Sequence, residues 1–222
     1  MSLEPAADPE RLYLAVGDDV NDARPIFTGD IFREIEIPGV GTAPAIVIAH
    51  PCSIRGREGA LQDRIPVAAV AEHQSHPAKN WSSGFYDRMP LPGLPLDGPF
   101  HVAKLAMFGL ASTNELVGAE RVGCLSEPGI NQLQQRLVFH LTRLEVPASK
   151  FQEAFDHTYE EAELLENWAT DLADIDDQPA ASFETWIREG SPSRQERLLD
   201  HAERAPVRRE LRDEVKLRRQ AD

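Results

Sequence analysis

The chain has 222 residues, enough for one medium-sized domain with appendages or for one domain and a smaller second one. Its formal net charge of −14 at pH 7 argues against unaided, non-specific nucleic-acid binding, because phosphate affinity needs a basic surface. Two cysteines give no disulfide framework, and neither a membrane-spanning apolar run nor a signal peptide is apparent. A soluble, cytoplasmic protein without membrane contact is therefore expected.

Short strands dominate the first two thirds of the sequence. Residues 1–25, rich in proline and acidic side chains, are expected to form a partly ordered lead-in with one weak strand at 12–16. Apolar segments bounded by proline and glycine predict further strands at 31–37, 45–49, 64–71, 100–107 and 121–125. Residues 77–99 are expected to be loops. This spacing is typical of a small β-barrel rather than a βαβ sheet.

A helix is predicted after the last strand. Ser126 is its expected N-cap, and Glu127 and Pro128 suit the first turn. Apolar side chains recur at helical spacing on one face, which is expected to close the barrel. These residues are Ile130, Leu133, Leu137, Leu141 and Leu144.

Residues 148–222 are expected to form a helical extension. Its first helix has an apolar stripe that includes Trp168 and Leu172, and it overlaps a run of ten acidic and no basic residues from Glu153 to Asp177. That acidic run is interpreted either as a solvated surface or as a built-in inhibitor lying across the barrel. The basic last segment, 204–219, is interpreted as a surface helix with i,i+4 salt bridges rather than as a nucleic-acid arm.

Reactive side chains follow two of the predicted strands, and strand ends are common places for a site. The strand at 45–49 stops at Pro51 and is followed by His50, Cys52, Ser53, Arg55 and Arg57. The strand at 64–71 is followed by Glu72, His73, Gln74 and His76. Ordinary loop hydrogen bonding is the alternative for both groups. Trp81, in the loop-rich stretch, is either a base-stacking side chain or a packing residue beneath the loop.

The order of these segments resembles the PemK/MazF toxin family over about residues 27–146. The segments concerned are Gly29-Asp30-Ile31-Phe32, Ala43-Pro44-Ala45-Ile46-Val47-Ile48, Ile65-Pro66-Val67-Ala68-Ala69-Val70 and Arg121-Val122-Gly123-Cys124-Leu125-Ser126. The resemblance implies an SH3-like β-barrel at 26–147, usually homodimeric. Such a barrel cleaves single-stranded RNA without a metal or other cofactor, and a partner antitoxin neutralises it.

Both usual catalytic residues of that family are replaced at the matched positions. Ala43 stands where the family has an arginine, and Ala71-Glu72-His73 stands where it has a threonine or serine. The chemistry has therefore been rebuilt or lost. The chain is either a toxin-like, metal-independent endoribonuclease with a non-standard site, or an inactive barrel that serves as a binding or regulatory module through its helical extension.

A rebuilt site needs a base, an acid and a cation, because RNA transphosphorylation moves two protons and develops negative charge on phosphorus-bound oxygens. His50 and His73 are the expected acid/base pair, provided that the two strand ends lie on the same side of the barrel. Arg55 and Arg57 are expected to hold the phosphate. The expected RNA-binding residues are Ser53, Gln74 and Trp81.

Two other chemistries use the same residues. A zinc site is conceivable from four side chains, although their spacing is not that of structural zinc sites, so no metal is expected. These side chains are His50, Cys52, His73 and His76. Cys52 is alternatively a covalent nucleophile beside His50, with Pro51 between them making direct contact awkward.

Overall fold

The chain forms two compact units in the computed structural model, which describes residues 3, 9–56, 60–74 and 86–221, except for the side chains of residues 9, 10 and 155. The first, called the barrel unit below, comprises Met1–Asn21, Ile26–Ile54 and Gln62–Ala154. The second, called the helical unit, comprises Asp22–Pro25, Arg55–Leu61 and Phe155–Asp222. The boundary between the two units lies inside a helix, between residues 154 and 155, and not at the expected residue 147. Two short internal segments, 22–25 and 55–61, are also assigned to the helical unit.

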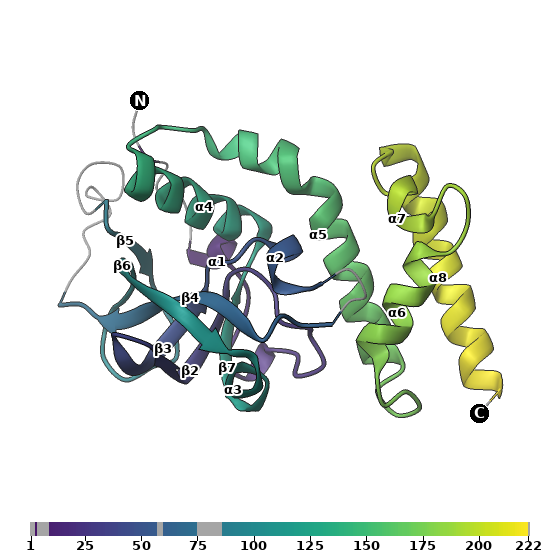
Figure 1. Ribbon diagram of the computed structural model, residues 1–222, viewed down its shortest axis with the longest axis horizontal. Coiled ribbons are helices and arrows are strands. Elements are labelled where there is room, and N and C mark those ends of the chain that lie inside the picture. Colours follow the sequence, from purple (N-terminus) through teal and green to yellow (C-terminus); the bar gives the residue numbers. More distant parts are fainter. Residues whose placement is uncertain (1–2, 4–8, 57–59, 75–85, 222) are drawn as a thin grey trace. The chain divides into compact units, whose positions relative to one another are not determined.

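Seven antiparallel strands of the barrel unit form one curled sheet, a half-barrel, in the order β1-β7-β2-β3-β4-β6-β5 (Figure 1). The strands are β1 (Tyr13–Val16), β2 (Asp30–Ile37), β3 (Gly41–Val47), β4 (Arg64–Glu72), β5 (Arg88–Leu91), β6 (His101–Ser112) and β7 (Arg121–Leu125). The expected combination of a small barrel-like sheet with helices is confirmed at this level.

Local sequence explains the central hairpin of the sheet. Ile31, Ile35 and Ile37 of β2 are fully buried, which fits the partial alternation of apolar and polar residues in this strand. The turn to β3 closes with a hydrogen bond from the Val40 N–H to the Ile37 carbonyl, 2.9 Å. Gly39, at φ +83°, supplies the left-handed conformation that this turn requires.

The N-terminal segment is not the separate lead-in that composition suggested. Helix α1 (Pro9–Leu12) leads into β1, which pairs with β7 through Tyr13 opposite Leu125, and the 3₁₀ turn η1 (Gly17–Asp19) follows. Leu12 is 1% exposed. The segment belongs to the barrel unit because its backbone completes one edge of the sheet and its leucine enters the core.

The stretch expected to be loops contains an additional strand. β5 pairs with the first residues of β6, with Met89 opposite Ala103 and Leu91 opposite His101. Met89 and Leu91 are fully buried. β6 itself runs to Ser112, further than predicted, and pairs with β4 along its other edge.

Besides α1, the helices that accompany the sheet are α2 (Pro51–Ile54), α3 (Thr113–Gly118) and α4 (Glu127–Thr142). The predicted cap of α4 is confirmed, since the Ser126 hydroxyl accepts a hydrogen bond from the Gly129 N–H at 3.2 Å. The predicted closing face is only partly right. Ile130 and Leu133 are buried, whereas Leu141 and Leu144 are 61% and 63% exposed, because α4 ends at Thr142.

Helices α5 (Ala148–Asp171), α6 (Pro179–Arg188), α7 (Arg194–Arg197) and α8 (His201–Ala221) supply the helical unit, which α5 enters at residue 155. Its core is built on Trp168, Phe183 and Trp186, with the two indole centroids 5.4 Å apart. Val207, Leu211 and Val215 of α8 pack in the same core. The predicted apolar stripe is confirmed at Trp168 and Leu172, and Ser193 forms a capping box with Glu196 at the start of α7.

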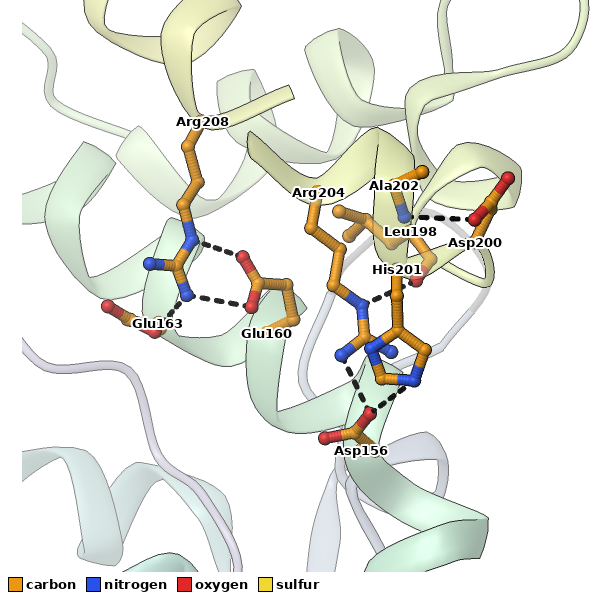
Figure 2. A network of polar contacts seen from close by, with 9 residues as sticks. All are labelled: Asp156, Glu160, Glu163, Leu198, Asp200, His201, Ala202, Arg204 and Arg208. Carbon is orange, nitrogen blue, oxygen red and sulfur yellow. Dashed lines mark hydrogen bonds and ion pairs between the residues drawn. The ribbon is translucent and has the colours of Figure 1, made fainter. Parts of the chain in front are cut away.

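Four carboxylates of the acidic run pair with arginines of α8. Arg204 contacts Asp156 at 2.6 Å, and Arg208 forms a two-pronged pair with Glu160 and reaches Glu163 at 3.0 Å (Figure 2). Arg219 contacts Asp174 at 3.0 Å. These four side chains are therefore partners of α8, whereas Asp171 and Asp177 of the same run are exposed. One predicted i,i+4 pair, Arg218 with Glu214, is present at 2.8 Å.

A short internal segment contributes to the same unit. Arg24, only 8% exposed, forms an ion pair with Glu166 of α5. A buried guanidinium is costly without such a partner, so the 22–25 segment is held to the helix by a charge pair.

We expect Gly129→Ala to destabilise the barrel unit by about 1–3 kcal/mol, the usual cost of overpacking. A Cβ at this position would lie 2.2 Å from the Leu12 carbonyl oxygen. Urea unfolding followed by circular dichroism measures the effect. Gly118→Ala is the matched control, because a Cβ there meets nothing within 4 Å. Equal stability of the two variants would contradict the packing described.

The α5–α8 charge pairs make a second prediction. Arg208→Ala should cost the helical unit about 1–3 kcal/mol, because Glu160, 8% exposed, would lose its two-pronged partner. Tryptophan fluorescence during urea unfolding reports on this unit, which contains Trp168 and Trp186. Arg209→Ala, at the neighbouring exposed arginine, should change stability by less than about 0.5 kcal/mol. A similar loss in both variants would argue against a specific pair.

Candidate functional site

The two histidines predicted as an acid/base pair lie at opposite ends of neighbouring strands. β3 and β4 are antiparallel, with Val47 opposite Val67. His50 follows the end of β3, beside the start of β4, whereas His73 lies six residues beyond Val67, roughly 20 Å along the strand at about 3.3 Å per residue. The condition that both strand ends share one side is not met, and the pair is not assembled.

The group around His50 forms a compact turn instead. The Cys52 N–H donates to His50 Nδ1 at 3.2 Å, and the Ser53 N–H donates to the His50 carbonyl at 2.7 Å, as α2 begins. Cys52 and Ser53 are exposed. These contacts are the local hydrogen bonding of a strand end.

One of the arginines expected beside these histidines, Arg55, is assigned to the helical unit, where its positive charge acts on the carboxylate of Glu184. Burial is the main cause that raises the pKa of Glu184, and Arg55 and Arg188 counteract it. Arg57 and Trp81 lie outside the described residues, as does His76. Gln74 is exposed, directly after His73.

His73 has partners that the sequence analysis did not anticipate. Its Nε2 lies 3.0 Å from Nη1 of Arg88, and the same guanidinium contacts Asp87 twice, Nε to Oδ1 at 3.1 Å and Nη2 to Oδ2 at 3.2 Å. Because a guanidinium only donates, His73 Nε2 is the acceptor and its imidazole is neutral in this arrangement. His73, Asp87 and Arg88 are called the His73 cluster below.

The sheet topology creates this cluster. β4 and β5 lie on opposite edges of β6, with Glu72 opposite His101 and Arg88 opposite Lys104. The His73 N–H continues the ladder by donating to the Phe100 carbonyl at 2.8 Å. A long arginine side chain from β5 thereby reaches the imidazole just past the end of β4.

Helix α4 contacts the segment that carries Asp87 and Arg88. Arg136, 1% exposed, donates from Nη1 to the Arg88 carbonyl at 3.2 Å. Burial lowers the pKa of Arg136 to about 10. One turn later the Phe139 ring lies 4.8 Å from the Tyr86 ring, centroid to centroid. The backbone on both sides of Asp87 is therefore fixed against this helix.

The opposite charges of Arg88 and Asp87 offset each other, and both side chains are partly exposed to solvent. The Arg88 hydrogen bonds are the main cause that lowers the pKa of Asp87, and the positive charge of His140 adds to it. A lowered carboxyl pKa means that this pairing contributes stability above the unfolded-state pKa and loses it as the pH falls through the folded-state value. The side chains of Arg88 and Asp87 are 24% and 48% exposed, so an anionic ligand could reach them.

Among the described residues, no group of three or more His, Cys, Asp or Glu side chains is arranged to hold a metal ion. The described part of the chain likewise has no helix both long and apolar enough to cross a bilayer. The side chains of the candidate site are an imidazole, a guanidinium and a carboxylate.

Sequence reasoning missed Asp87 and Arg88 because they lie in a stretch rich in proline and glycine. The available signal was a charged pair placed directly before the short apolar run Met89-Pro90-Leu91. That run is a buried strand, and the charges stand at its start.

Comparison with known proteins gives no further assignment, since no protein-family model and no curated protein matches the chain. The site is therefore argued from its own geometry.

The hydrogen bond from Arg88 predicts the tautomer of His73. At about pH 8, where imidazoles are largely neutral, His73 should carry its proton on Nδ1 and accept at Nε2. Long-range ¹H–¹⁵N NMR spectra of the imidazoles distinguish the two tautomers. Arg88→Ala should change the His73 signals, whereas Arg64→Ala, at the other end of β4, should not. An Nε2-protonated His73 in the unaltered protein would contradict the assignment.

Proposed function

We propose that the protein is a toxin-like, metal-independent endoribonuclease of the PemK/MazF type whose site is rebuilt around the His73 cluster. The observation that carries this proposal is the 3.0 Å contact between His73 Nε2 and Arg88 Nη1. His73 closes the strand on which that family has its threonine or serine, and Arg88 supplies a guanidinium although Ala43 has replaced the family's arginine.

The strand order supports the family assignment. β2, β3 and β4, which carry three of the resembling segments, are consecutive neighbours in the sheet, and β7, which carries the fourth, lies beside β2. We include in the proposal the SH3-like class of the barrel, a homodimeric state and neutralisation by an antitoxin, which the resemblance implies.

The cluster supplies two of the three groups that RNA cleavage requires, a base and a cation. A neutral imidazole is a suitable base for the ribose 2′-hydroxyl once bound RNA draws the Arg88 hydrogen bond away from Nε2, and the guanidinium then stabilises the charge that develops on the phosphoryl oxygens. Asp87 binds Arg88 through two nitrogens and so fixes the plane of the guanidinium. A lysine could not make this set of contacts, because its ammonium lacks the planar fork.

The charge distribution is compatible with an RNA substrate. Residues 26–147 contain ten basic and twelve acidic residues, a net charge of −2, so most of the chain's −14 lies elsewhere in the sequence. Much of the remaining acidic charge belongs to helix α5, where Asp156, Glu160 and Glu163 already have arginine partners.

The test is cleavage of single-stranded RNA of random sequence by the purified full chain in excess EDTA. We expect cleavage to products with 2′,3′-cyclic phosphate ends. His73→Ala and Arg88→Ala should each lower the rate about 100-fold or more. His50→Ala, which removes the histidine at the opposite end of the strand pair, should retain the rate.

Loss of activity in His50→Ala with retention in His73→Ala would transfer the site to the end of β3. Absence of cleavage by the unaltered, folded protein would overturn the catalytic proposal. It would favour the inactive barrel that acts as a binding or regulatory module through its helices.

A further inference from the structure

The last turn of α4 presents a second histidine to the His73 cluster. His140 follows Arg136 by four residues, so the two side chains lie on the same face of the helix. Arg136 contacts the Arg88 carbonyl, and Phe139, beside His140, contacts the ring of Tyr86. These two contacts, in the turn that leads to His140, hold this end of α4 against the segment that contains Tyr86 and Arg88.

The surroundings of His140 give it no evident structural task. Its Nδ1 is buried and makes no hydrogen bond to any residue that the structure describes. Buried polar atoms of this kind call for an explanation, because most find a partner within the fold. His140 is also close enough to Asp87 for its positive charge to help lower the pKa of that carboxyl.

We propose that His140 is the general acid of the RNA cleavage for which His73 is the base; this inference rests on the function proposed above. The two imidazoles differ in their neighbours. Arg88 donates to His73 Nε2 and so holds His73 neutral, the form that accepts a proton. His140 lies on the helix that contacts the Arg88 carbonyl and, in its charged form, is the imidazole that can donate one.

The step balances without a metal or a redox partner. When RNA binds, Arg88 transfers its hydrogen bond from His73 Nε2 to a phosphoryl oxygen. The freed Nε2 removes the proton of the 2′-hydroxyl while the 2′-oxygen forms a bond to phosphorus, and Arg88 stabilises the resulting phosphorane. The bond from phosphorus to the 5′-oxygen then breaks, and that oxygen takes its proton from His140. The products are a 2′,3′-cyclic phosphate and a 5′-hydroxyl, and the two histidines exchange protons with water to reset the site.

A substrate whose leaving group needs no proton distinguishes a general acid from a residue that is only structural. The cleaved linkage is first mapped in random-sequence RNA, and an oligonucleotide is then made with sulfur in place of the 5′-oxygen at that linkage. A thiolate leaves without protonation. We expect His140→Ala and His140→Gln to lower cleavage of the oxygen substrate about 100-fold or more and cleavage of the sulfur substrate less than about tenfold.

His73→Ala should slow both substrates alike, and His201→Ala, at an exposed histidine of the helical unit, should slow neither. Equal loss on both substrates in the His140 variants, or loss on neither, would overturn the role of His140 while leaving the proposed function standing. If the unaltered protein cleaves no RNA, both proposals fail together. Circular dichroism of each variant identifies any that is misfolded, and the larger Gln side chain provides a second variant.

Discussion

Strand β6 is the element on which the candidate site depends, because its two edges pair with different strands. β4 lies along one edge and β5 along the other, so an imidazole from the end of one strand meets a guanidinium from the start of the other. Each backbone hydrogen bond contributes only about 1 kcal/mol net, yet the ladder as a whole fixes both main chains. Little further ordering of the side chains is then needed for His73 and Arg88 to meet.

The sequence predicted the strands whose signal is local. β2, β3, β4 and β7 are apolar segments bounded by turn-forming residues, and Ser126 is a helix cap recognisable from its neighbours. β5 was not predicted, because a proline such as Pro90 argues against a strand in the middle of a sheet. The proline is tolerated since β5 is the last strand in the order, where one edge has no further strand to pair with. The low β-propensity of proline is outweighed here by the position of β5 at the edge of the sheet.

The site was harder to predict than the fold, because its residues meet only through strand direction and register. His73 was identified from its place after an apolar segment, but its partner was chosen as His50, and antiparallel pairing separates the two. Arg88 is 15 residues from His73 in the sequence and belongs to no motif. Its contact with His73 follows from the strand order β4-β6-β5 and from the packing of α4 against Arg88, and a local sequence pattern contains neither.

The path of the chain between its two units has a consequence for how the protein can be divided. The chain passes between them five times, because two short stretches, Asp22–Pro25 and Arg55–Leu61, belong to the helical unit although they interrupt the barrel sequence. One of them carries Arg24, whose charge is matched by Glu166 of α5. No single cut in the sequence separates the residues of the two units, and a cut after residue 154 would part Arg24 from Glu166. A truncated barrel would therefore still carry two segments that belong with the helical unit.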